Sequence, residues 1–345
     1  MILQKITVEV PNSYNIIFEK SFEPLVAFIA KEKYSKIAIV TDKNVNKHYG
    51  VSLENALKDY DVKKIVLPSG EKIKTLESAE ILYNKFTEFR LTRADVVISL
   101  GGGVVGDLTG FCASTFLRGI PFIQVPTSLL AQVDSSIGGK VAVNTAEGKN
   151  LIGSFYQPKF VLINTDFLKT LPKRNLSDGM AELIKHAAIM DDELWVSIKS
   201  DNFDLASAIF VSCSIKAHIV SNDEFDISTR MLLNFGHTIG HAVETHHKYR
   251  KYTHGEAVAI GMYNISLVGE KLGVTTGGTA KRMRLMLEKF HLPTKLDIPR
   301  KKLLKIMETD KKTFGEQINM VFLNEIGRAE IKGISISELP SLFGV

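Results

Sequence analysis

Short β-branched runs alternate with helical stretches along the first half of the chain. Segments 36–42, 64–67 and 94–100 are rich in Ile and Val, as buried strands are, and the stretches 52–60 and 76–89 repeat apolar residues at helical spacing. Strands that alternate with helices predict βαβ units and a parallel sheet. Residues 1–10 alternate apolar and polar positions like a strand, and they lack the charged start and apolar core of a signal peptide.

Helical periodicity dominates beyond Pro172. It covers the segments 178–190, 205–220, 231–246, 257–272 and 281–290, and only 318–323 has strand character. A chain of 345 residues also suits two ordinary cores better than one. We therefore predict an N-terminal α/β domain over residues 1–171 and a mostly α-helical C-terminal domain over residues 172–345, with the active site in the cleft between them.

Composition and charge exclude several classes of protein. Apolar residues make up 45% and charged residues 23% of the chain, which is ordinary for a soluble globular protein, and no run approaches the roughly 18 apolar residues of a membrane span. Cys112 and Cys213 lack metal-type spacing and suit a reducing cytoplasm. The net charge of +5 comes from dispersed basic residues, so we expect an anionic small molecule as the partner and no nucleic acid.

A glycine turn follows the strand at 94–100. Gly101, Gly103 and Gly106 match G-x-G-x-x-G, whose glycines let the backbone approach a pyrophosphate at a helix N-terminus. The turn follows the third strand instead of the first, and the acidic residue, Asp42, lies upstream at the end of the strand 36–42. A second glycine loop at 68–72 also follows a strand. The pattern favours a nucleotide site, and an ordinary tight turn is the alternative.

The segment 126–140 combines hydroxyls, a carboxylate, two glycines and a lysine without a clear helical or strand period, and Lys149 and Asn150 follow it. Such groups next to glycines bind oxyanions and hydroxyls, because ammonium and backbone N–H donors converge there. Long loops without secondary structure are usually functional. The alternative is an ordinary loop with solvated lysines.

Histidines cluster between residues 237 and 254. His237 and His241 lie four residues apart on one helical face, as metal ligands do, and Thr238 stands where a zinc peptidase carries its glutamate base. Two imidazoles and a carboxylate with an open position suit a catalytic zinc-like ion. Spacing leaves the choice open among His237, His241, His254, Glu182, His186, Glu244 and Glu256.

Seven motifs in order resemble the 3-dehydroquinate synthase family of the shikimate pathway, over residues 42 to about 323. They are SGEKIK at 69–74, GGGVVGDLTGFCAS at 101–114, FLRGIPFIQVPTSLLAQVDSSIGGK at 116–140, GKNLIG at 148–153, AELIKH at 181–186, LNFGHTIGHA at 233–242 and HGEAVAIGM at 254–262. The resemblance implies a Rossmann-like first domain. It also implies a lyase that converts 3-deoxy-D-arabino-heptulosonate 7-phosphate to 3-dehydroquinate and phosphate, through transient oxidation by NAD⁺, phosphate elimination, re-reduction and an intramolecular aldol closure.

The resemblance also assigns roles to individual residues. It implies Glu182, His237 and His254 as ligands of Zn²⁺ or Co²⁺, and it leaves His241 for proton transfer and substrate contact. Arg118 resembles an arginine that reaches the phosphate from a neighbouring subunit, so a homodimer is implied. The other residues implied at the substrate are Lys140, Asn150, Lys185, Lys216, Arg230, Asn234 and Asp134, and one of Lys311 and Lys312.

For NAD, the matching positions lie in several separate segments. They are Asp42, Asn44, Ser69, Gly70, Glu71, Lys72, Ile73, Lys74, Gly103, Val104, Val105, Gly106, Asp107, Thr127, Ser128, Lys140, Lys149, Phe167, Leu168, Lys169 and Thr170. Two departures from the family pattern are His186, where an aromatic residue is common, and the sequence Ser154-Phe155-Tyr156, where Ala-Phe-His is usual.

Three other functions are weighed against this one. Another sugar phosphate cyclase, such as a 2-deoxy-scyllo-inosose synthase or a valiolone synthase, would keep the NAD and metal motifs but change some substrate positions. A glycerol-dehydrogenase-like oxidoreductase would release NADH. A non-enzymatic NAD sensor would have no reason to keep the metal and phosphate-binding residues together.

Overall fold

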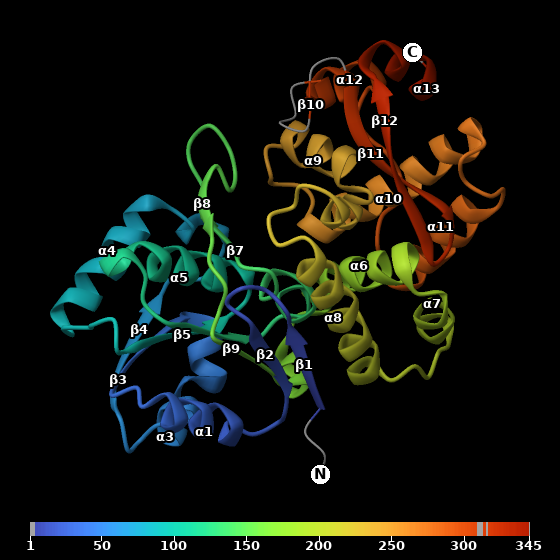
Figure 1. Ribbon diagram of the computed structural model, residues 1–345. Helices are drawn as coiled ribbons and strands as arrows, with labels where there is room; N and C mark the ends of the chain where they lie inside the picture. Colours follow the sequence, from blue (N-terminus) through green and yellow to red (C-terminus); the bar gives the residue numbers. More distant parts are fainter. Residues whose placement is uncertain (1–3, 309–312, 315–316, 345) are drawn as a thin grey trace. The chain divides into compact units, whose positions relative to one another are not determined.

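The computed structural model describes residues 4–308, 313–314 and 317–344 (Figure 1). The chain forms two compact units. Unit 1 comprises Met1–Pro172 with Lys216–Glu224, and unit 2 comprises Lys173–Ile215 with Phe225–Val345. The helix α8, Leu205–Asn222, therefore begins in unit 2 and ends in unit 1.

Unit 1 is built on a seven-stranded sheet with the order β1-β2-β9-β6-β5-β3-β4. β1 pairs antiparallel with β2, and the other pairs are parallel, which confirms the predicted α/β class. The strands are β1 (Gln4–Val8), β2 (Tyr14–Phe18), β3 (Lys36–Asp42), β4 (Asp61–Leu67), β5 (Val96–Gly101), β6 (Phe122–Pro126) and β9 (Phe160–Ile163). A separate hairpin joins β7 (Lys140–Val143) to β8 (Ile152–Phe155).

Helices cover both faces of this sheet (Figure 1). Successive side chains of a strand point to opposite faces, so Ile37 and Ile39 of β3 enter one core and Ala38 and Val40 enter the other. The first core contains residues of α1 (Glu23–Glu32) and α3 (Val51–Ala56), and the second contains residues of α4 (Leu76–Glu88) and α5 (Gly103–Thr115). Shorter turns are α2 (Lys43–Val45), η1 (Asn46–Gly50), η2 (Glu71–Ile73), η3 (Phe116–Arg118), η4 (Ala131–Ser135) and η5 (Thr165–Thr170).

Unit 2 is mostly helical, as predicted, and it adds a small antiparallel sheet in the order β10-β11-β12. Strand character is more extensive than the sequence indicated, because β12 pairs with β11 along its length. The helices are α6 (Lys173–Met190), α7 (Asp192–Lys199), α9 (His237–His246), α10 (His254–Leu272), α11 (Thr279–Lys289), α12 (Arg300–Glu308) and α13 (Leu339–Phe343), with the short η6 (Thr229–Asn234) and η7 (Ile336–Glu338). The strands are β10 (Thr313–Phe314), β11 (Gln317–Glu325) and β12 (Arg328–Ser335).

The helix expected over 231–246 is interrupted at Gly236. This residue has φ 79°, a left-handed conformation that favours glycine, and it separates η6 from α9. The break lets α9 begin at His237.

Glycines allow α9 and α10 to approach each other closely. A Cβ added to Gly261 would lie 1.9 Å from the backbone oxygen of Gly236, and one on Gly240 would lie 3.0 Å from that of Ala257. At the start of α10, a Cβ on Gly255 would lie 2.1 Å from the oxygen of Asp178 in α6. Side chains at these positions would force the three helices apart.

The helix α8 is more apolar than the sequence analysis expected. Its 18-residue window has a mean hydropathy of 1.3, which by length and composition would suffice to cross a membrane. Half of that window is buried inside the structure, as in the core helix of a soluble protein, so the helix is weak evidence for a span.

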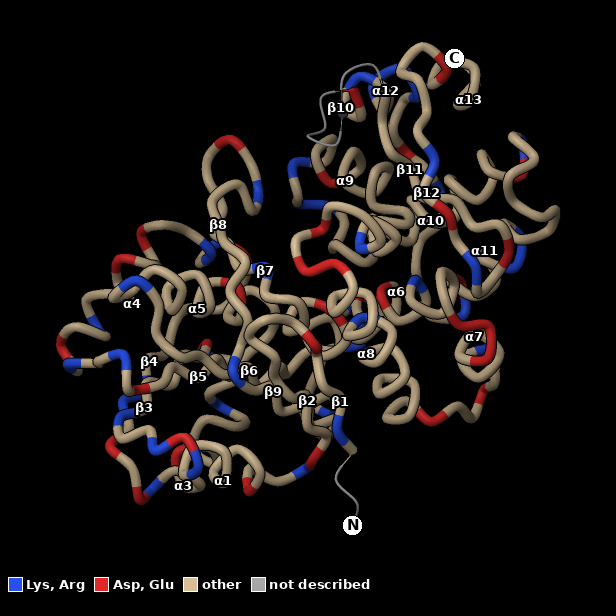
Figure 2. Tube along the Cα trace, viewed as in Figure 1, with Lys and Arg blue, Asp and Glu red and all other residues tan. Residues whose placement is uncertain are grey.

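Basic and acidic residues are interspersed along the part of the chain that the structure describes (Figure 2). Blue segments of Lys and Arg alternate with red segments of Asp and Glu in both units.

We predict that Gly261→Ala destabilises the protein by about 1–3 kcal/mol, because the added methyl group overpacks the contact with Gly236. Urea unfolding monitored by circular dichroism measures the loss. Gly277→Ala is the matched control: its Cβ would meet no atom within 4 Å, so we expect a change within about 0.5 kcal/mol. Equal effects of the two substitutions would contradict the close packing.

Candidate active site

The parallel strands of unit 1 end at one edge of the sheet, where open α/β sheets bind their ligands. Asp42 ends β3, and its Oδ1 accepts hydrogen bonds from the N–H of Asn44 (2.8 Å) and the hydroxyl of Ser69 (2.7 Å). The carboxylate thus joins the turn after β3 to the loop after the neighbouring β4. The structure brings together three residues that the resemblance implied at NAD.

The glycine turn leads directly into α5. The helix begins at Gly103, and no side chain caps its N-terminus. A Cβ on Gly103 would lie 2.9 Å from Ser135 Oγ, and one on Gly102 would lie 3.3 Å from Ser128 Oγ. Glycine therefore serves two purposes here, because it lets the segment 128–135 approach and leaves the first helical N–H groups open to an anion.

A buried lysine links three segments of unit 1. Lys74 Nζ lies 2.5 Å from Asp107 Oδ2 in α5 and 2.5 Å from Asn150 Oδ1, and the lysine is only 4% exposed. Burial raises the pKa of Asp107, and the adjacent ammonium of Lys74 opposes this shift. Lys74 and Asp107, which are expected at NAD, thus form one polar cluster with Asn150, which is expected at the substrate.

The segment 126–140 is less irregular than its sequence suggested, since it contains the helical turn η4. Asp134 in this turn accepts hydrogen bonds from Lys216 Nζ at both its backbone oxygen and its Oδ1, each at 2.5 Å. Lys216 lies on the part of α8 that belongs to unit 1. Its partner would be hard to find from sequence, because 82 positions separate the two residues.

The remaining candidates of unit 1 lie in other elements. Lys140 starts β7, Lys149 lies between β7 and β8, and Arg118 is an exposed residue of η3 with φ 64°. Phe167–Thr170 lies in η5, where the hydroxyl of Tyr49 contacts both the oxygen of Phe167 (3.1 Å) and Thr170 Oγ1 (2.7 Å). Thr127 and Ser128 follow β6 directly.

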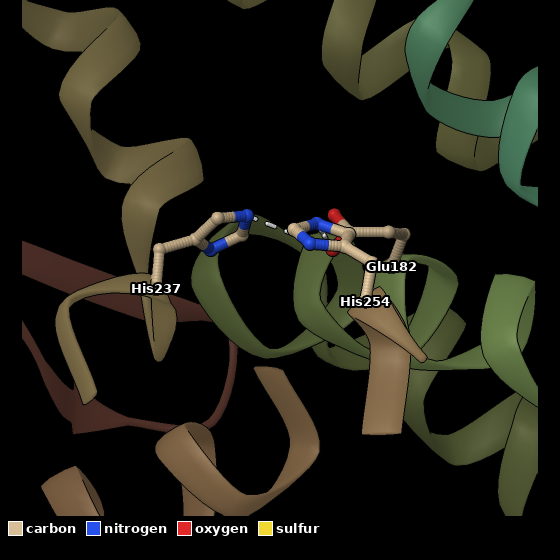
Figure 3. A group of neighbouring side chains, drawn as sticks. All are labelled: Glu182, His237 and His254. Atoms are coloured by element: carbon tan, nitrogen blue, oxygen red, sulfur yellow. Dashed lines mark ion pairs between the residues drawn. The ribbon is translucent and has the colours of Figure 1, made fainter. Parts of the chain in front are cut away.

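Unit 2 gathers a carboxylate and two imidazoles (Figure 3). Potential ligand atoms of Glu182 from α6, His237 from the start of α9 and His254 from the start of α10 all lie within 4.8 Å of one another. Nε2 of His237 lies 3.8 Å and Nε2 of His254 lies 3.6 Å from Glu182 Oε1. Glu182 is fully buried, and Lys185 on the same helix forms an ion pair with its Oε2. A divalent cation fits this set, because two imidazoles and a carboxylate are the ligands of catalytic zinc-like sites.

The electrostatic field of this cluster favours positive charge. Burial lowers the pKa of His254, but the contact with Glu244 and the charges of Glu182 and Asp178 outweigh it and raise the pKa to about 9. The carboxylates that favour a positive charge on this imidazole would also stabilise a bound cation.

Further candidates surround the cluster. The ring centre of His241 lies 5.5 Å from that of His237 and 6.3 Å from that of His254, so a third imidazole stands beside the three ligand candidates. Lys185 is buried and forms an ion pair with Glu182. Arg230 and Asn234 lie on η6, which leads into α9. Lys311 and Lys312 lie outside the described residues.

The structure narrows the seven ligands that spacing allowed. His186 Nδ1 pairs with Ser212 Oγ at 2.7 Å, and both Glu256 oxygens accept hydrogen bonds from Arg174 at 2.7 Å. Glu256 therefore has another partner at both carboxylate oxygens, and His186 has one at a single ring nitrogen. Glu182, His237 and His254 converge.

Two residues that hold the site together, Asp178 and Thr253, were not singled out from the sequence. At the start of α10, Thr253 and Glu256 form a capping box, and Asp178 Oδ1 accepts a hydrogen bond from the N–H of Gly255 at 2.6 Å. Asp178 and Glu182 are four residues apart on α6, so one helix face contacts both the helix end and the imidazole. The spacing of Asp178 and Glu182 is visible in the sequence, but the sequence does not show that this face of α6 packs against the start of α10.

Asp297 fastens the loop between α9 and α10. It accepts hydrogen bonds from His247 (3.0 Å), Tyr252 (2.9 Å) and Lys251. Burial alone would raise the pKa of Asp297, but these donors hold it well below its usual range. The loop that leads into His254 is therefore anchored at three of its positions.

Family models match most of the chain. The 3-dehydroquinate synthase N-terminal model matches residues 64–178, and the C-terminal model matches residues 179–313. A 3-dehydroquinate synthase from Clostridium acetobutylicum is 49% identical over 338 residues, which cover 95% of each chain.

Solved structures with the same fold include a 2-deoxy-scyllo-inosose synthase complexed with carbaglucose-6-phosphate, NAD⁺ and Co²⁺, with a TM-score of 0.86 and 23% identity over 99% of each chain. A 2-epi-5-epi-valiolone synthase from Streptomyces hygroscopicus with NAD⁺ and Zn²⁺ has a TM-score of 0.82 and 24% identity over 98% of each chain. The fold is thus shared with these cyclases. The chain itself belongs to the 3-dehydroquinate synthase family, which confirms the resemblance of its motifs.

We predict that Lys74→Met destabilises the protein by about 3–5 kcal/mol, because it leaves the buried Asp107 carboxylate without its cation. The double variant Lys74→Met/Asp107→Asn should recover part of this loss. Urea unfolding of the wild type, both single variants and the double variant measures the coupling. Additive effects would contradict a direct ion pair.

We predict that Asp297→Asn costs about 1–2 kcal/mol near pH 7. The folded pKa of Asp297 is lowered, so its stabilising contribution is present above the unfolded value of about 3.9 and is lost as the pH falls toward the folded value. The difference in unfolding free energy between variant and wild type should therefore shrink at about pH 3. A difference that stays constant with pH would contradict the assignment.

Proposed function

We propose that this protein is a lyase that converts 3-deoxy-D-arabino-heptulosonate 7-phosphate to 3-dehydroquinate and phosphate. The identity of 49% to a 3-dehydroquinate synthase along almost the whole chain supports the specific reaction. The observation that carries the chemistry is the convergence of the buried Glu182 and His237 with the partly buried His254, with the imidazole of His241 alongside.

Two cofactors fit the residues. Glu182, His237 and His254 would hold one Zn²⁺ or Co²⁺ ion, and Asp42, the loop 69–74 and the start of α5 would hold NAD⁺. When bound, NAD⁺ supplies a reversible hydride acceptor and the ion polarises the hydroxyl that is oxidised. Accordingly, we assign NAD binding to residues 1–171 and the metal ion and most substrate contacts to residues 172–345.

The chain's own side chains bind and orient the substrate. Lys185 comes from α6, which also carries Glu182, and Arg230 and Asn234 come from η6, just before α9. The other candidates, Asn150, Lys140, Lys216 and Asp134, come from unit 1. Cationic and amide donors suit the carboxylate, phosphate and hydroxyls of the substrate. His241 transfers the proton, because an imidazole can donate and accept near neutral pH. Fixed donors lower the barrier by holding one conformer of the substrate.

The protein is further proposed to be a cytoplasmic homodimer in which Arg118 of one copy reaches the phosphate in its neighbour. Arg118 is exposed and follows α5, where it is accessible to a second chain. Both cysteines are buried and form no disulfide in the described part of the chain, which suits a reducing compartment.

Purified protein supplied with the heptulosonate phosphate, NAD⁺ and Zn²⁺ or Co²⁺ should release one phosphate per 3-dehydroquinate, without net accumulation of NADH. Phosphate release and absorbance of NADH measure the two quantities. His254→Ala should lower the rate by about 10²–10³-fold even with excess metal, because it removes a ligand. His48→Ala, an exposed histidine of η1, is the matched control with an unchanged rate.

Competing functions give different results in the same assay. Steady accumulation of NADH would indicate a glycerol-dehydrogenase-like oxidoreductase. Turnover of glucose 6-phosphate in place of the heptulosonate phosphate would indicate a 2-deoxy-scyllo-inosose synthase, whose solved structure holds the carba analogue of that sugar.

A further inference from the structure

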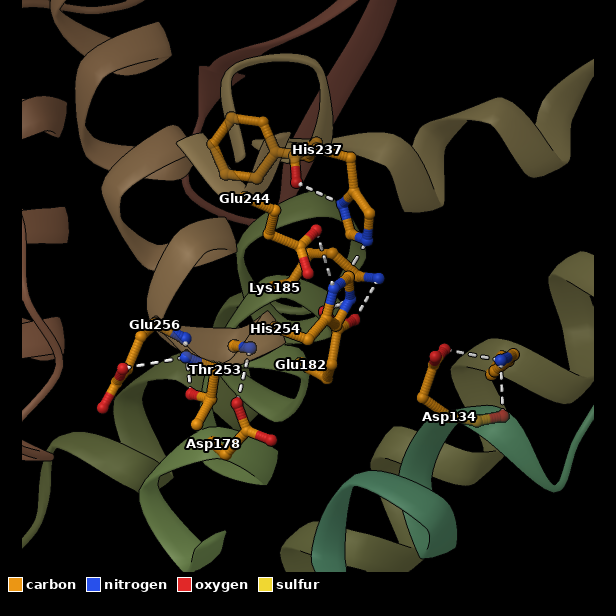
Figure 4. A network of polar contacts seen from close by, with 12 residues as sticks. Asp134, Asp178, Glu182, Lys185, His237, Glu244, Thr253, His254 and Glu256 are labelled. Carbon is orange, nitrogen blue, oxygen red and sulfur yellow. Dashed lines mark hydrogen bonds and ion pairs between the residues drawn. The ribbon is translucent and has the colours of Figure 1, made fainter. Parts of the chain in front are cut away.

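The imidazole of His254 lies between two carboxylates (Figure 4). Its Nε2 is 3.6 Å from Oε1 of Glu182, and its Nδ1 is 3.6 Å from Oε2 of Glu244. Each ring nitrogen therefore has its own carboxylate. Glu244 is only 5% exposed, so its charge is held close to this ring and away from solvent.

The same pattern holds at His237. Its Nδ1 contacts the backbone oxygen of Phe235 at 3.2 Å, while its Nε2 points toward Glu182. Both imidazoles thus present Nε2 to one carboxylate and Nδ1 to another oxygen. Metal-binding histidines usually have this arrangement, in which the second nitrogen donates to an oxygen that fixes the tautomer and the ring orientation.

Helix geometry explains the position of Glu244. It lies two turns after His237 on α9, so both side chains lie on one face of the helix. That face packs against the start of α10, where the close approach at Gly240 brings α9 next to His254. From sequence spacing Glu244 was one of seven possible ligands, whereas the structure places it behind a ligand.

We propose that Glu244 is a positioning residue that accepts the Nδ1 proton of His254 and so leaves Nε2 unprotonated for the metal ion. The inference rests on the metal requirement of the proposed function. A neutral imidazole carries one proton, so a carboxylate at Nδ1 selects the tautomer whose Nε2 can bind a cation. Asp178 and the capping box hold the backbone at the start of α10 in place. Glu244 then has only to orient the ring of His254.

The test measures Zn²⁺ affinity of the full chain by competition with a chelator, without NAD or substrate. Glu244→Leu should weaken binding by about 10–100-fold, and Glu244→Gln should weaken it less, because the amide oxygen still accepts the proton. The absorption spectrum of the Co²⁺-loaded protein should also shift in Glu244→Leu, since the ring of His254 is no longer held. If Glu244 had a purely structural role, the Co²⁺ spectrum would not shift. Glu244→Leu would then also weaken Zn²⁺ binding no more than Glu244→Gln does.

Glu256→Gln is the matched control. In the described part of the structure the hydrogen bonds of Glu256 join it to Arg174 and Thr253, and a glutamine at this position can still complete the capping box. It should keep Zn²⁺ affinity within about threefold of the wild type. Unfolding of each metal-free variant separates loss of fold from loss of affinity, and Glu244→Gln carries the test if Glu244→Leu does not fold.

Wild-type affinity in Glu244→Leu, or an equal loss in Glu256→Gln, would overturn the inference and leave the proposed function intact. Conversely, a wild-type protein that binds Zn²⁺ with the expected dependence on Glu244 but forms no 3-dehydroquinate would refute the proposed function alone.

Discussion

Glu182 places a carboxylate at a fully buried position of α6, and the parts of unit 2 around it compensate that charge. His237 and His254 reach it from the first residues of two different helices, and Lys185 reaches it from the next turn of α6. A buried charge without such partners would cost several kcal/mol. The close contact of α6, α9 and α10 is therefore both a packing arrangement and an electrostatic requirement.

Small residues make that arrangement possible. Gly236 lets the chain turn before His237, Gly261 lets α10 pass next to that turn, and Gly255 lets the start of α10 meet α6. Polar contacts then fix the helix ends, since Asp178 binds the N–H of Gly255 and Arg174 binds Glu256. The histidines are thus oriented by backbone geometry before any ion is present.

Unit 1 also contains a buried charge that its surroundings compensate, but here the charge is positive. There the buried group is the ammonium of Lys74, which is compensated by Asp107 and Asn150. Asp42 and Ser69 join the loops after adjacent strands. In both units a buried ion joins segments that lie far apart in the sequence, and it holds them at the position where polar ligands are expected.

Much of this protein can be read from its sequence. Alternation of β-branched runs and helical periods predicted the α/β class and the helical second half, because side-chain periodicity is a local property. Motifs from 69–74 to 254–262 indicated the family and nominated the candidate residues. Spacing alone could not choose among seven possible metal ligands, and it missed the break at Gly236 and the strand β12.

Only the tertiary structure decided those points. Glu182 and His254 are 72 positions apart, and nothing local to either one indicates that α6 and α10 meet at Gly255. The same holds for Lys74 with Asn150 and for Asp134 with Lys216. Sequence periodicity determines which face of each element is apolar. Which polar groups meet depends on how those faces pack, and that is settled by long-range contacts and by the need to pair every buried charge.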